Sequence, residues 1–199
     1  MITLPDSSTV TVTFAAINSD GSPGNFLGAY TASNPEWTGW SDFQSDYLSA
    51  QVNTIPGDTM LQLVGGQNET YEVTLSAPIV GPLMDIVSLG AAGTNTQYDF
   101  NAPFTILSQG QDYWGGCATC LTQSGNDLIG NEGSGTIQFN GTYSSFDWTV
   151  PVGENWHGFT FGIETTQALL QQQNSVPEPG GALLVGIALG GLAAARRRR

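Results

Sequence analysis

The stretch GTIQFNGTYSSFDWTV, residues 135–150, decides the fold class of this chain. Apolar and polar side chains alternate on both sides of its centre, which is the period of a β-strand with one buried face. At the centre lies Asn140–Gly141, a dipeptide that favours a type I′ turn because asparagine and glycine tolerate positive φ. The sequence therefore predicts two antiparallel strands, 135–139 and 142–150, joined by a tight hairpin.

The same alternation recurs on either side of this stretch. It is found at residues 9–14, 71–76 and 159–164, and shorter apolar runs occupy residues 60–64, 83–89 and 104–107. Pro78 is expected to end the strand that begins at residue 71, because proline cannot donate to a strand ladder. With 26 glycines and few charges, the composition favours short strands and many turns. The chain is predicted to be all-β, an antiparallel β-sandwich or jelly-roll-like ectodomain over residues 1–164.

The distribution of charge excludes nucleic acid as a partner. The formal net charge is 4 − 17 = −13, and the four cationic side chains are the last four residues of the chain. Residues 1–195 therefore contain no lysine or arginine, whereas nucleic acid binding requires cations that face the phosphates.

Free carboxylates can bind divalent cations. Asp20 lies in the turn NSDGS, residues 18–22, which contains oxygen ligands around a glycine. The distal acid of a calcium loop is absent at the expected spacing. Asp20 is thus a weak calcium candidate beside the alternative of a plain β-turn.

The last residues of the chain have three successive parts. They are the motif Val176-Pro177-Glu178-Pro179, an apolar glycine-rich span at residues 180–195, and the cations Arg196, Arg197, Arg198 and Arg199. A spanning helix needs about 20 apolar residues, and this span reaches about 24 Å at 1.5 Å per residue. Snorkelling arginines and local thinning of the bilayer compensate for the short length. The terminal arginines predict one transmembrane helix with a cytoplasmic C-terminus.

The order of these parts resembles the PEP-CTERM sorting signal of Gram-negative bacteria that make exopolysaccharide. Pro177, Glu178 and Pro179 match the motif, and the span and terminal arginines match the rest of the signal over residues 176–199. The resemblance implies an exosortase as processing partner, a membrane-embedded cysteine protease or transpeptidase that removes the tail. An ordinary C-terminal anchor is the alternative.

The resemblance implies a route for the protein. The precursor is expected in the inner membrane with a cytoplasmic C-terminus, and the processed form in the cell envelope or outside the cell. The Gln-rich residues 165–175 are expected to be a linker. Residues 1–8 contain neither the charged nor the apolar region of a signal peptide, so a truncated N-terminus is expected.

Cys117 and Cys120 form a CxxC motif in a glycine-rich loop. Zinc would require more ligands of the kinds it prefers, and a thioredoxin-like site requires a βαβ context that the sequence lacks. A local disulfide requires only two cysteines and an oxidising compartment. We expect the disulfide, with metal binding and redox activity as the alternatives.

Catalytic chemistry is poorly represented. The chain has one histidine, His157, and no G-x-S-x-G elbow. Its many carboxylates leave a glycan-active enzyme with paired acids as a rival hypothesis. Trp37 and Trp40, in a polar Pro/Gly-containing segment, are candidate glycan-stacking residues or buried packing. We expect a non-enzymatic, cofactor-free matrix protein associated with exopolysaccharide; the third alternative is a passive structural surface protein.

Overall fold

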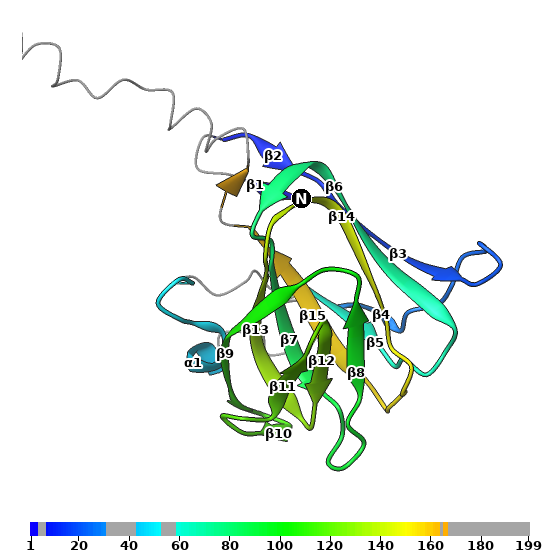
Figure 1. Cartoon of the computed structure of the whole chain (residues 1–199), viewed down its shortest axis with the longest axis vertical. Helices are drawn as coiled ribbons and strands as arrows, with labels where there is room; N and C mark the ends of the chain where they lie inside the picture. The colour runs from blue at the N-terminus through cyan, green and yellow to red at the C-terminus, as the bar shows by residue number, and fades with distance from the viewer. Residues whose placement is uncertain (4–6, 31–42, 53–58, 164, 167–199) are drawn as a thin grey trace, which may run out of the picture. The chain divides into compact units, whose positions relative to one another are not determined.

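The computed structural model describes residues 1–3, 7–30, 43–52, 59–163 and, for their backbone, 165–166. Trp37, Trp40, the sorting motif, the apolar span and the terminal arginines lie outside these residues. A first compact unit comprises Met1–Gln167. Within its described part, all the strand pairs are antiparallel, which confirms the predicted all-β sandwich (Figure 1).

Two seven-stranded sheets build the sandwich. The first sheet has the order β10 (Gly115–Gly116), β9 (Phe104–Asp112), β13 (Gly133–Phe139), β7 (Leu83–Leu89), β15 (His157–Gly162), β5 (Met60–Leu63) and β4 (Gly28–Tyr30). The second has the order β11 (Leu121–Ser124), β12 (Asp127–Gly130), β8 (Gln97–Phe100), β14 (Thr142–Thr149), β6 (Glu69–Val80) and β16 (Thr165–Thr166), with β3 (Val12–Asn18) also paired to β6. A small separate pair joins β1 (Ile2–Thr3) to β2 (Thr9–Val10).

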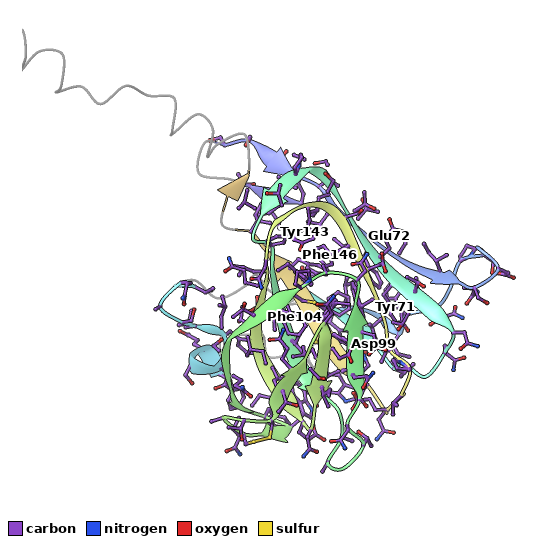
Figure 2. The ribbon with its side chains drawn as sticks, viewed as in Figure 1. Tyr71, Glu72, Asp99, Phe104, Tyr143 and Phe146 are labelled. Atoms are coloured by element: carbon purple, nitrogen blue, oxygen red, sulfur yellow. A yellow bond between two sulfur atoms is a disulfide. The ribbon has the colours of Figure 1, made fainter. Side chains whose placement is uncertain are left out.

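Aromatic side chains fill the space between the two sheets. In β14, Phe146 and Trp148 are buried while the residues between and beside them are more exposed, as the alternation predicts. The register places Tyr71 of the neighbouring β6 opposite Trp148. Figure 2 labels Tyr71 and Phe146 on these two strands. The Trp148 ring also lies 5.3 Å from that of Phe159, which belongs to β15 of the first sheet. The sandwich core is thus a continuous aromatic cluster shared by both sheets.

The predicted hairpin at Asn140–Gly141 is wrong. β13 pairs with β7 and β9, whereas β14 pairs with β6 and β8, so the chain changes sheets at this dipeptide. Gly141 has φ +140°, while Asn140 does not have the positive φ that a type I′ turn requires. The Asn140 N–H instead donates to Pro103 O at 2.8 Å and Gly81 N–H donates to Gly141 O at 2.8 Å. These bonds hold the dipeptide as a corner between the layers.

The expected end of a strand at Pro78 is also wrong, because β6 continues to Val80. The ladder between β6 and β3 stops at Leu75, and the ladder to β14 shifts register between Tyr143 and Ser145. Pro78 lies at this irregularity, where its missing N–H interrupts no regular ladder. The residue is tolerated by the same mechanism that permits proline at β-bulges.

A short helix, α1 (Gln44–Tyr47), was not predicted and covers the outer face of the first sheet. It lies beside β9 and contacts β9 and β13 (Figure 1). The helix can approach closely because Gly110 of β9 has no side chain: a Cβ there would lie 1.9 Å from Asp46 Oδ1. β7 is buried on both faces, and Tyr47 of α1 packs in one cluster with its Val87.

Strand pairing continues just past residue 164, since Thr165 and Thr166 of β16 pair with Val80 and Ile79 of β6. Among the residues that the structure describes, none lies in a helix long and apolar enough to cross a membrane. The span at 180–195 is not among those residues.

Candidate functional site

Two aromatic residues occupy the tip of the hairpin between β9 and β10. Asp112 pairs with Gly115, so Tyr113 and Trp114 alone form the loop. Positive φ values occur not at the tip but at Gly115 (+133°) and Gly116 (+88°). Asp112 Oδ1 accepts the N–H of Trp114 at 2.8 Å, an Asx-type turn contact. The flanking residues therefore make the turn, and the tip positions are free to carry large side chains.

The tip continues into a larger aromatic surface. The ring of Tyr113, 75% exposed, lies 5.4 Å from that of Trp114 in an edge-on arrangement. Trp114 in turn lies 4.7 Å from Trp156, which comes from the loop before β15. Both tryptophans are half-buried and pack on the cluster of Tyr47, Met60 and Val87. We name Tyr113, Trp114 and Trp156 the aromatic tip.

The disulfide predicted between Cys117 and Cys120 is confirmed, with a Cα–Cα distance of 5.1 Å. Cys117 directly follows β10, and the carbonyl of Cys120 accepts the N–H of Asn131 at 3.0 Å. The bridge thereby ties the second strand of the hairpin to the turn between β12 and β13. The loop it closes is short, so its effect is local stiffening of the region next to the tip.

We expect Cys117 and Cys120 to be fully oxidised in exported protein. Alkylation of the unfolded protein without reductant should label neither cysteine, and alkylation after reduction should label both. Mass spectrometry of the peptide that contains both cysteines measures the ratio of labelled to unlabelled thiol. Labelling of both thiols without reductant, or zinc that copurifies with the protein, would contradict this expectation.

Three carboxylates are buried where α1 meets the first sheet: Asp46 of α1, Asp85 of β7 and Asp112 of β9. Asp112 accepts the hydroxyl of Ser134, and Asp85 is hydrogen-bonded to the hydroxyl of Thr136. Burial is the main cause that raises the pKa of all three carboxyls, and it raises the pKa of Asp85 to about 7. The Asp112 charge adds to the rise in the pKa of Asp46.

These three carboxylates do not have the setting of a glycosidase acid pair. Each is more than nine-tenths buried between α1 and the sheet, and Asp85 and Asp112 are bonded to hydroxyl groups of the sheet. A glycosidase acid and its partner must instead face a glycosidic bond in a cleft. The arrangement favours a role in docking α1 on the sheet.

His157 is fully buried in the sandwich. Its Nδ1 lies 2.8 Å from Glu154 Oε1, and the same oxygen accepts the N–H of Gly90 at 2.7 Å. The ring faces that of Tyr98 at 5.2 Å. His157 thus joins the loop before β15 to the end of β7, as expected of a structural histidine.

Asp20 lies in an ordinary turn. Its Oδ1 accepts both the N–H of Ser22 at 2.9 Å and the hydroxyl of Ser22 at 2.6 Å. These bonds lower the pKa of the carboxyl. Within the described part of the chain, no group of three or more His, Cys, Asp or Glu side chains has a metal-binding arrangement.

The structure describes the aromatic tip but not the two residues predicted to bind glycan. Trp37 and Trp40 lie outside the described residues. Tyr113 and Trp114 were not among the binding residues predicted from the sequence. The available signal was the segment Asp112-Tyr-Trp-Gly-Gly116, in which two adjacent aromatics stand between an aspartate and a glycine pair that can make a turn.

Comparison with known proteins gives no match: no protein-family model, no curated protein and no solved structure is similar to this chain at a significant level.

Proposed function

We propose that this chain is an exported, exosortase-processed, non-enzymatic protein of the cell envelope or extracellular matrix. The observation that carries the proposal is the order of three parts at the C-terminus: Pro177-Glu178-Pro179, an apolar span and the arginine cluster. Exosortase is the processing partner, and the membrane holds the precursor until the tail is removed. The terminal arginines remain on the cytoplasmic side until then.

Two properties of the ectodomain are consistent with this route. A disulfide between Cys117 and Cys120 suits an oxidising compartment outside the cytoplasm. Net negative charge without lysine or arginine in residues 1–195 favours solubility outside the cell. We further propose association with exopolysaccharide, with Trp37 and Trp40 as the contacts expected from sequence. The rivals are a glycan-active enzyme with paired carboxylates and a passive structural surface protein.

The tail should be absent from the mature protein. Mass spectrometry of material recovered from outside the cell is expected to find a C-terminus between Val176 and Gly180, because the sorting motif marks the boundary of the removed segment. Replacement of Glu178 by alanine should leave full-length precursor in the membrane fraction, whereas Glu164→Ala, outside the motif, should be processed normally. An intact Arg199 on the mature extracellular form would reject the sorting proposal.

A further inference from the structure

The residues at the aromatic tip are not explained by the turn they occupy. Two-residue hairpin loops ordinarily contain glycine, asparagine or aspartate. Here Asp112 supplies the Asx contact and Gly115 and Gly116 supply the positive φ values, so the two central positions have no backbone requirement for an aromatic residue. Positions that break a local sequence rule without a structural need are expected at functional sites.

Packing does not explain Tyr113 either. Its side chain is 75% exposed, against 44% for Phe26, the only other phenylalanine or tyrosine among the large exposed side chains of the described residues. Trp114 and Trp156 pack against the cluster below them, and Tyr113 stands on the edge of this pair. The result is an aromatic surface with a supported base and an exposed end, which is the form of a contact surface.

We propose that the aromatic tip, Tyr113 with Trp114 and Trp156, is a binding site for an uncharged polysaccharide. The inference rests on the proposed association with exopolysaccharide, and it assigns that association to residues other than Trp37 and Trp40. Sugar rings carry an apolar C–H face that packs on aromatic side chains and hydroxyl groups that hydrogen-bond at the rim. Gln111 and Thr119, near the tip in the chain, have exposed polar side chains.

The charge of the chain selects uncharged sugars over acidic ones. Without the four terminal arginines the formal charge of the protein is −17, and the described residues include no lysine or arginine that could face a uronate, sulfate or phosphate. Glu132 lies close to the hairpin, since a Cβ on Gly115 would lie 3.8 Å from the Glu132 side chain. A polyanion would therefore meet repulsion at the tip, whereas a neutral glycan would not.

The disulfide holds the tip in one arrangement before the ligand arrives. It fixes the chain directly after β10, while Trp156 supports Trp114 from the other loop. A surface ordered in advance loses less conformational entropy on binding. The Cys117–Cys120 bridge therefore acts by ordering the binding site, whereas its contribution to global stability is small.

The test is affinity electrophoresis of the full-length protein through gels that contain a polysaccharide. The detergent is a polyoxyethylene ether, because sugar-based detergents would compete. The probes are the producer's own exopolysaccharide, hydroxyethylcellulose and dextran as neutral polymers, and polygalacturonate as a polyanion. Tyr113→Ala is compared with Tyr113→Phe, which keeps the ring, and with Phe26→Ala, which removes an exposed aromatic elsewhere.

We expect retardation of the wild type by the native polymer and at least one neutral probe, and none by polygalacturonate. Tyr113→Ala should weaken the apparent affinity about fivefold, the effect of losing one stacked ring. Tyr113→Phe and Phe26→Ala should stay within about twofold of the wild type on the same scale. Because Tyr113 is exposed, its removal should leave the thermal unfolding midpoint unchanged, which separates loss of binding from loss of fold.

Four results would overturn the assignment. If Tyr113→Ala is retarded like the wild type while Trp37→Ala or Trp40→Ala is not, glycan association stands and the tip is not its site. Retardation by polygalacturonate alone rejects the uncharged class of ligand. Failure of every polymer to retard the wild type rejects both the site and the association. Dimerisation that Tyr113→Ala abolishes, without any effect of polysaccharide, would make the tip a contact between copies of the chain.

Discussion

Replacement of Asp85 by asparagine should raise the free energy of unfolding at pH 8, while at pH 4 the variant and the wild type should be nearly equal. Asp85 is 4% exposed in β7, and burial raises its pKa from 3.8 to about 7 although a hydrogen bond from Thr136 opposes the rise. Between the unfolded pKa of 3.8 and the folded pKa of about 7, the folded chain binds more protons at Asp85 than the unfolded chain does. Stability therefore falls as the pH rises from about 4 to about 7, by up to ~4 kcal/mol for this group.

The hydrogen bonds around Asp85 also indicate that the folded chain is more stable when this carboxyl is protonated. The Thr136 hydroxyl is bonded to Asp85 Oδ1 and lies 3.0 Å from the carbonyl oxygen of Tyr47 in α1. A hydroxyl has one proton, and a carbonyl can only accept. Both bonds form together when Asp85 is protonated and donates to Thr136, which then donates to Tyr47. An ionised Asp85 competes with Tyr47 for the one proton, whereas the amide of asparagine can replace the protonated acid.

Urea unfolding of both proteins at pH 4, 6 and 8 measures the effect. Asp20→Asn is the matched control, because Asp20 lies in an exposed turn and its pKa is lowered rather than raised. A smaller pH dependence should remain in Asp85→Asn, since burial also raises the pKa values of Asp46 and Asp112. Wild-type stability that is constant or increases from pH 4 to pH 7 would contradict the proposed protonation of Asp85.

The sequence predicted which side chains are buried better than it predicted which strands are neighbours. Alternation in residues 142–150 identified Phe146 and Trp148 as core because a period of two depends only on local geometry. The partners of β13 and β14 depend on contacts between distant segments, and Asn140–Gly141 serves a corner between sheets as well as it would serve a hairpin. Local turn chemistry cannot distinguish these two uses.

The burial of Asp85 illustrates a second limit. The apolar run at residues 83–89 indicates a strand covered on both faces, yet nothing local shows what covers it. Part of the cover is α1, whose Tyr47 packs in one cluster with Val87 of β7. This four-residue helix has no apolar periodicity and is held by backbone carbonyls that accept from Ser108 and Thr136. The aromatic tip was missed for a related reason, since the Trp114–Trp156 contact joins loops far apart in the sequence.

Truncation of Trp148 to alanine should cost about 4 kcal/mol of unfolding free energy, the usual loss when a large aromatic leaves a packed core. Trp148 is fully buried at the centre of the aromatic cluster. Its ring lies within 6.4 Å, centroid to centroid, of the rings of Phe14, Tyr71, Tyr98, Phe100, Phe146, Phe159 and Phe161. Domains of this size are stable by only about 5–15 kcal/mol, so this loss is a large share of the total stability.

Two further variants identify the origin of that loss. Trp148→Phe retains a ring in the cluster and should recover more than half of the stability that alanine loses, because less volume is left empty. Val152→Ala removes an exposed apolar side chain and should change stability by less than about 0.5 kcal/mol. Urea unfolding followed by circular dichroism measures all three. A loss below about 1 kcal/mol for Trp148→Ala would mean that the two sheets do not share this core, because cavity formation at a site touched by rings from both sheets cannot be that mild.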